Sequence, residues 1–213
     1  MKKQKIVYYK DELNDEFSSA VIEPKKIDKD YRYIRDGFFG RLASFVSYRL
    51  LAMPLSFLFL KLKYAHRIKN RKVLKKEKGP YFIYGNHTSA AADPFIPTFT
   101  ACPKRVYVIV NAANVSMPFL GRITPYLGAL PLPDGLAATH NFTRAVQKRV
   151  AQKRVICIYP EAHIWPYCTK IRNFTDASFR YPVQYKNPSF CFTNVYTKRK
   201  LFSTPKITTY VDG

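Results

Sequence analysis

Short apolar runs alternate with amphipathic segments over the second half of the chain. "PYFIYG", "RVYVIVN" and "RVICIYP" start at residues 80, 105 and 154, and they are rich in β-branched and aromatic side chains. Such runs are typical of strands buried on both faces of a sheet. Residues 137–153, "AATHNFTRAVQKRVAQK", carry apolar side chains at helical spacing between two of these runs. The pattern predicts an α/β domain with a largely parallel, twisted sheet flanked by helices.

Two more strands are predicted near the C-terminus. "FCFTNVY" starts at residue 190 and "KITTYV" at residue 206. Because the chain stops at Gly213, just past the second of these runs, we expect a truncated end.

The stretch from Phe38 to Leu62, "FFGRLASFVSYRLLAMPLSFLFLKL", is the most apolar part of the sequence. It contains Arg49 and is interrupted by Pro54, and a proline kinks or breaks a helix. A spanning helix needs about 20 apolar residues, so the length is borderline. We expect a membrane-docking helical hairpin or amphipathic segment that lies in one leaflet. A true membrane span and a pair of buried core helices are the alternatives.

A polybasic stretch follows, with nine lysines or arginines between Lys61 and Lys78. Next to an apolar anchor, each such cation contributes roughly 1 kcal/mol of attraction to an anionic leaflet. The whole chain has 36 Lys and Arg against 14 Asp and Glu, a formal net charge of +22. We therefore expect an anionic membrane surface as partner, at the cytoplasmic face. No nucleic-acid partner is expected, because the cations gather beside an apolar segment rather than on an aromatic strand face.

This organisation suggests three parts. Residues 1–37 form a polar N-terminal segment, residues 38–78 the apolar hairpin with its polybasic stretch, and residues 79–213 the α/β domain. The four cysteines lie far apart and form no C-x-x-C pair, so no metal site is predicted.

Polar groups follow two of the predicted strands, where an open α/β sheet places its functional site. His87 and Asp93 come after the strand at 81–84, and Glu161 and His163 after "VICIY". A carboxylate can fix the tautomer of a histidine that acts as a general base. Six residues of helix would leave His87 and Asp93 about 120° apart, so they meet only if residues 88–92 form a turn. The alternative is that Asp93 caps a helix starting at Pro94.

Three stretches together resemble the glycerolipid acyltransferase superfamily, typified by 1-acylglycerol-3-phosphate acyltransferases. They are "GNHTSAAADP", "MPFLGRITPYLGALPLP" and "IYPEAH", which occur in the order of the family's motifs. The resemblance runs from about residue 79 to the end of the chain, with the preceding segment similar to the family's membrane-docking region.

The resemblance implies roles for individual residues. His87 would be the catalytic base that deprotonates the acceptor hydroxyl, and Asp93 would orient it. Arg122 would bind a phosphate of the acceptor, and Glu161 would hold the acceptor or the geometry of the site. The substrate-binding residues implied in this way are Asn86, Gly121, Arg122, Glu161 and His163.

The sequence departs from the family pattern at each of the three motifs. At the end of the second, "PLPDG" lacks the arginine that the family often has there. Five residues rather than four separate His87 from Asp93, so the intervening turn must bulge. Ala162 and His163 stand in the third motif where the family has glycine and then threonine or serine, and its arginine is absent. Lys170 and Arg172 are the candidates to supply that charge.

The resemblance predicts an acyltransferase of phospholipid biosynthesis. It would move a fatty acyl group from acyl-CoA or acyl-carrier protein to a lysophospholipid hydroxyl, without a metal or a bound cofactor. A catalytically weak lipid-binding or membrane-scaffold protein of the same fold is the alternative.

Overall fold

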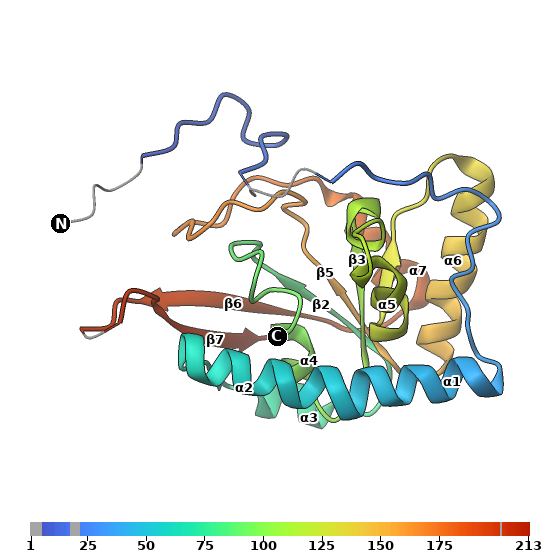
Figure 1. Cartoon of the computed structure of the whole chain (residues 1–213), viewed down its shortest axis with the longest axis horizontal. Coiled ribbons are helices and arrows are strands. Elements are labelled where there is room, and N and C mark those ends of the chain that lie inside the picture. The colour runs from blue at the N-terminus through green and yellow to red at the C-terminus, as the bar shows by residue number, and fades with distance from the viewer. Residues whose placement is uncertain (1–5, 18–21, 201) are drawn as a thin grey trace.

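The computed structural model describes residues 6–17, 22–200 and 202–213. In these ranges seven strands form one sheet in the order β1-β7-β6-β2-β5-β3-β4 (Figure 1). All neighbouring strands are parallel except β6 and β7. The predicted α/β fold with a largely parallel sheet is confirmed. The strands are β1 Arg67–Lys69, β2 Tyr81–Gly85, β3 Val106–Val110, β4 Ala129–Pro131, β5 Val155–Ile158, β6 Ser189–Thr197 and β7 Lys206–Asp212.

Helices cover both faces of the sheet. The α-helices are α1 Phe38–Phe45, α2 Met53–Tyr64, α3 Lys72–Lys76, α4 Ile96–Ala101, α5 Leu120–Leu127, α6 Leu136–Ala151 and α7 Arg180–Tyr185. A π-helix, η1 Val46–Ala52, joins α1 to α2, and short 3-10 turns occur at η2 Ala112–Val115 and η3 Asp176–Phe179.

The central strand β2 is buried along its whole length. Because successive strand residues point to opposite faces, Tyr81 and Ile83 pack with α2, α3 and α4, whereas Phe82 and Tyr84 pack with α6 and α7. The second face also buries Ile27 from the N-terminal segment. The predicted polar segment 1–37 is therefore, over part of its length, a packed portion of the domain.

The apolar segment forms one helix rather than a hairpin. α1, η1 and α2 are continuous over 27 residues from Phe38 to Tyr64, along the lower side of Figure 1. The expectation of a hairpin is wrong because Pro54 does not end the helix. It is the second residue after the wider π-turns of Val46–Ala52, where a looser hydrogen-bond pattern accommodates the proline ring.

The long helix is not a buried core element either, since only 11% of its most apolar stretch is buried. Tyr48, Leu60 and Tyr64 face the domain. The guanidinium of Arg49 donates to the Pro103 carbonyl at 2.9 Å. By length and composition this helix could cross a membrane. Its large exposed apolar side chains are Phe38, Phe39, Leu42, Phe45, Val46, Leu50, Leu51, Leu55, Phe57, Leu58 and Leu62.

The polybasic stretch is part of the folded domain. Residues 67–69 form the edge strand β1, which pairs with β7, and Leu74 of α3 belongs to the core. The α/β domain thus begins before residue 79, the boundary expected from the sequence.

His66, which has no neighbouring polar motif in the sequence, is buried at the start of β1. Its Nε2 lies 2.9 Å from the Thr209 hydroxyl. Burial, with a smaller contribution from Lys61, lowers the pKa of His66 to about 4. The imidazole is therefore neutral at physiological pH.

His66 should make the fold sensitive to mild acid. Its folded pKa of about 4 lies below the ordinary value of 6.5, so the unfolded chain binds the proton more tightly. The contribution of neutral His66 to the free energy of unfolding is complete above pH 6.5 and is lost as the pH falls toward 4. We expect the free energy of unfolding to fall between pH 7 and 4 by about 3 kcal/mol more in the wild type than in His66→Gln. Denaturant titrations over this range measure the difference. His140→Gln, at an exposed position, should follow the wild type, and parallel wild-type and His66→Gln curves would contradict the expectation.

Candidate active site

Two neighbouring parallel strands deliver the polar residues to one edge of the sheet. Tyr84 of β2 is in register with Ile158 of β5, so both strands end at the same edge. At the end of β2, a Cβ on Gly85 would lie 2.2 Å from the Phe192 ring. Glycine is therefore required where the chain leaves the sheet and turns toward His87.

The structure brings His87 and Asp93 into contact. The His87 Nδ1 lies 2.9 Å from Asp93 Oδ2, and the carboxylate has no solvent exposure. The same oxygen accepts the backbone N–H groups of Thr88 and Ser89, each at 2.8 Å. The five intervening residues form a turn in which the Asp93 N–H donates to the Ser89 carbonyl at 3.0 Å. The extra residue is thus absorbed without separating the pair.

The alternative interpretation, in which Asp93 caps a helix, is wrong. Helix α4 begins at Ile96, and its N-cap residue is Phe95. The Asp93 carboxylate points back to the turn at residues 87–89 instead. Because the Asp93 carboxylate accepts a hydrogen bond from Nδ1, the ring proton stays on Nδ1. Nε2 is therefore the basic atom of His87.

Tyr159 stacks on the histidine ring. The two ring centroids are 4.5 Å apart with an interplanar angle of 19°. The Tyr159 hydroxyl donates to the Asp93 backbone carbonyl at 2.6 Å. Burial raises the pKa of Tyr159 well above its ordinary value, so this hydroxyl stays protonated. Tyr159 therefore packs the imidazole in place and links it to the turn.

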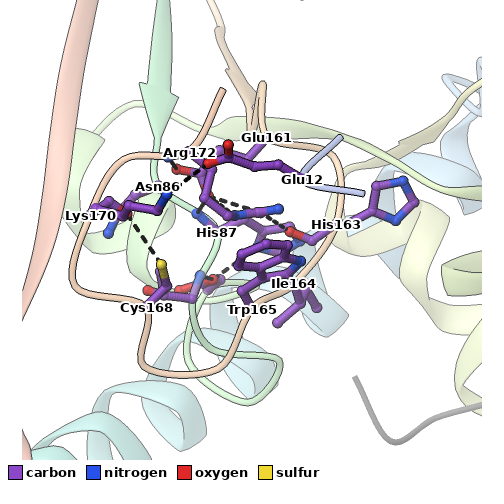
Figure 2. Close-up of polar contacts among 12 residues, drawn as sticks. Glu12, Asn86, His87, Glu161, His163, Ile164, Trp165, Cys168, Lys170 and Arg172 are labelled. Carbon is purple, nitrogen blue, oxygen red and sulfur yellow. Dashed lines mark hydrogen bonds and ion pairs between the residues drawn. The ribbon is translucent and has the colours of Figure 1, made fainter. Parts of the chain in front are cut away.

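Glu161 and Arg172 form a buried ion pair next to His87 (Figure 2). The Arg172 Nη2 donates to Glu161 Oε2 at 3.0 Å, and the two side chains are 0% and 1% exposed. Glu161 Oε2 also accepts the His87 backbone N–H at 3.2 Å. Of the two cations considered for the third motif, Arg172 is thus the one at the site, whereas Lys170 pairs with Glu12.

The loop after β5 is bound to the first motif through its backbone. The Trp165 N–H donates to the His87 carbonyl at 3.2 Å, and the Tyr167 N–H donates to the Thr88 carbonyl at 3.0 Å. The Arg172 guanidinium stacks over the Trp165 ring, 4.6 Å from its centroid. Loop and first motif therefore form one packed unit.

The N-terminal segment lies over this loop. The Trp165 indole N–H donates to the Asp15 carbonyl at 2.7 Å, and the ring packs 4.8 Å from Tyr9. His163 Nδ1 lies 3.4 Å from a Glu16 carboxylate oxygen. In Figure 2 the His163 ring points away from His87. The structure thus places His163 in the contact with the N-terminal segment rather than beside the histidine of the first motif.

A family model described as "Acyltransferase" matches residues 65–191, which is more than half of the chain. The chain belongs to the acyltransferase family. The match confirms the resemblance to the glycerolipid acyltransferases, and it begins close to β1, where the sheet itself begins. No curated protein matches the chain.

Asn86 of this acyltransferase has an internal role. Its side-chain Oδ1 accepts the Asn194 backbone N–H at 2.8 Å, and its Nδ2 donates to the Asn194 carbonyl at 3.2 Å. The amide thus continues the β2–β6 ladder by one step. Because both ends of the amide bond the neighbouring strand, the structure does not support the expected substrate-binding role of Asn86.

Gly121 and Arg122 lie in α5. A Cβ on Gly121 would lie 2.5 Å from the Val115 carbonyl oxygen, which explains the glycine. Arg122 is exposed and lines a hollow of about 700 Å³ together with Lys25. The residues that line this hollow do not include His87. Phosphate binding by Arg122 stays a prediction.

Sequence reasoning missed two residues of the acyltransferase site. Tyr159 is the last residue of the apolar run that leads into the third motif, and its position in that run is typical of a strand residue. Asn194 is a polar residue inside the run that predicts β6, and its Nδ2 donates to Asp93 Oδ1 at 3.3 Å. An amide within an otherwise apolar strand was the available signal. In the described part of the chain, no group of three or more His, Cys, Asp or Glu side chains is placed to hold a metal ion.

Arg172→Met should destabilise the protein strongly, because it leaves the Glu161 carboxylate buried without its cation. Removing one partner of a buried pair costs about 3–5 kcal/mol. Chemical denaturation with circular dichroism measures this loss. The double variant Glu161→Gln/Arg172→Met should be more stable than Arg172→Met alone, since it buries no unpaired charge. Lys170→Met, which breaks the exposed pair with Glu12, is the matched control and should have a much smaller effect. Equal losses from Arg172→Met and Lys170→Met would contradict the assignment.

Proposed function

We propose that this acyltransferase moves a fatty acyl group from a thioester to a lysophospholipid hydroxyl such as that of 1-acylglycerol-3-phosphate, in phospholipid biosynthesis. The donor would be acyl-CoA or acyl-carrier protein. The observation that carries the proposal is the 2.9 Å contact between His87 Nδ1 and the buried Asp93 carboxylate. It gives a base whose free nitrogen, Nε2, is suited to a hydroxyl substrate.

In the proposed reaction the acceptor hydroxyl gives its proton to His87 Nε2 as its oxygen attacks the thioester carbonyl. The new C–O bond forms, and the resulting tetrahedral intermediate collapses with cleavage of the C–S bond. The imidazolium then returns the proton to the departing thiolate. Asp93 stabilises the imidazolium between the two steps. Because a thioester is already a reactive acyl donor, positioning and one base suffice, and the scheme uses no metal, cofactor or acyl-enzyme.

An anionic membrane surface at the cytoplasmic face is the proposed location of the reaction. The helix from Phe38 to Tyr64 packs on the domain through residues as far apart as Tyr48 and Tyr64. To cross a bilayer it would have to leave these contacts along much of its length, which favours a helix lying in one leaflet. Cations at the end of α2, Lys61 and Lys63, and those of α3 would face the lipid headgroups.

Thiol release from acyl-CoA and acyl-carrier protein, with a panel of lysophospholipids, tests the reaction. We expect acceptor-dependent release by the wild type and a fall of about 10²–10⁴-fold in His87→Gln, because the general base is lost. His140→Gln is the control and should retain full activity. Release that persists in His87→Gln would contradict the mechanism. Absence of release with every donor and acceptor would favour a lipid-binding or membrane-scaffold protein of this fold.

Vesicle co-sedimentation tests the membrane surface. Leu51, Leu55 and Leu58 are 54%, 66% and 54% exposed and lie on one side of the helix. Replacing all three by serine removes about 1.5–3 kcal/mol of burial per side chain, so binding should fall at least tenfold. Leu136→Ser/Val183→Ser removes exposed apolar side chains elsewhere and is the control. Equal binding by both variants would contradict the docking role of the helix.

The same assay tests the charge of the surface. Wild-type binding should be stronger on phosphatidylserine than on phosphatidylcholine vesicles and should weaken with salt.

A further inference from the structure

A chain of buried hydrogen bonds crosses the sheet from His87 to His66. Asp93 Oδ2 contacts His87, and Asp93 Oδ1 accepts from Asn194 Nδ2 at 3.3 Å. Asn194 Oδ1 accepts the Thr209 hydroxyl at 2.7 Å. The Thr209 oxygen lies 2.9 Å from His66 Nε2. Asn194 lies in β6, Thr209 in β7 and His66 directly before β1, 143 residues from Thr209.

The donors in this chain all point the same way. Because Thr209 gives its hydroxyl proton to Asn194 Oδ1, its oxygen is left to accept from His66, and the neutral His66 supplies that proton from Nε2. The Asn194 amide is then oriented with its NH₂ group toward the Asp93 carboxylate. Each group thereby fixes the orientation of the next, and the chain ends on the carboxylate that holds His87.

We propose that Asn194 is a positioning residue for acyl transfer, which fixes the Asp93 carboxylate so that His87 carries its proton on Nδ1, and that Thr209 positions Asn194 in turn. This inference rests on the proposed function of His87 as general base. Asn194 does not touch the substrate in this scheme; it acts through Asp93.

The placement of Asn194 supports this role. It lies in the middle of β6, paired with Thr209 in the antiparallel β6–β7 ladder, and is 3% exposed. A buried amide costs free energy unless it is hydrogen-bonded, and here both ends of the side chain are used. Its backbone is bonded to the side chain of Asn86, the residue directly before His87. The position of Asn194 is therefore tied to that of the base itself.

Removing the Asn194 amide would leave the carboxylate with donors on Oδ2 alone. Thr88 and Ser89 both donate to Oδ2, the oxygen that contacts His87, whereas Asn194 donates to Oδ1. Without the contact on Oδ1, only the contacts on Oδ2 hold the carboxylate, and its rotation relative to the imidazole plane is less restricted.

Replacing Asn194 leaves the other charged and titratable groups around His87 in place. Glu161 bonds its backbone and is paired with Arg172, and Tyr159 stacks on its ring. Tyr196 contacts the neighbouring Thr88. A change in the pH–rate profile on mutating Asn194 would therefore report on the contact with Asp93.

Thr209 and Thr208 offer a matched pair of variants. They are adjacent on β7, both buried, and their side chains point to opposite faces of the sheet. Thr209→Val removes the hydroxyl that holds Asn194 while preserving shape, and Thr208→Val makes the same change outside the hydrogen-bond chain. Thr209→Ser keeps the hydroxyl and should restore the function.

The kinetic experiment compares these variants and Asn194→Ala, as full-length protein, in the acyl-transfer assay over a range of pH. We expect kcat to fall about 10–100-fold in Asn194→Ala and Thr209→Val, as for other groups that orient a reacting side chain, with KM within about twofold. The acid limb of the pH–rate profile should move as well. Thr208→Val and Thr209→Ser should stay within about twofold of the wild type. Equal losses in Thr208→Val and Thr209→Val would overturn the proposal, because they would indicate a general packing effect.

A second measurement does not depend on activity. The ¹⁵N NMR shifts of the His87 ring, assigned with His87→Gln, report which nitrogen carries the proton. We expect the Nδ1–H tautomer in the wild type and in Thr208→Val, and a loss of that tautomer in Asn194→Ala. A tautomer that does not depend on Asn194 would overturn the inference even if transfer depends on His87. If the wild type transfers no acyl group but the tautomer depends on Asn194, the positioning role holds and the proposed function fails.

Discussion

The site depends on a single carboxylate that is completely removed from water. Burying an ionised group is costly unless polar partners replace its hydration. Asp93 meets this requirement with backbone N–H groups on one oxygen and the Asn194 amide on the other. These donors fix the turn after β2, the relation of β6 to β2 and the orientation of His87. The local fold and the chemistry thus rest on the same set of hydrogen bonds.

The two buried carboxylates of the site are stabilised in different ways, and the difference suits their roles. Glu161 is paired with the Arg172 guanidinium, so its negative charge is balanced where it holds the His87 backbone. Asp93 is held by neutral donors, and it therefore keeps a charge that a protonated His87 can use. An anion balanced by arginine serves to build the loop, whereas an anion held by amides can stabilise an imidazolium.

Five of the seven strands, and the position of the site, could be predicted from the sequence because they depend on local patterns; the three-residue strands β1 and β4 carry no such apolar run. Continuous apolar runs specify buried strands, and polar residues just past two of them locate the edge where His87 and Glu161 meet. The long helix could not be predicted in the same way. Pro54 indicates a break, and only the π-turns that precede it explain why the helix continues. The burial of His66 depends on Thr209, which is 143 residues away.

The departures at the first and third motifs are compensated in space rather than in sequence. The additional residue between His87 and Asp93 lengthens a turn, yet the hydrogen bond it spans is 2.9 Å long. The arginine absent from the third motif has a counterpart in Arg172, which reaches Glu161 from 11 residues further along the chain. What the site requires is a balanced carboxylate and an oriented imidazole, and any chain path that delivers those groups satisfies it. Motif spacing is therefore a weaker constraint on this fold than the identity of the buried partners.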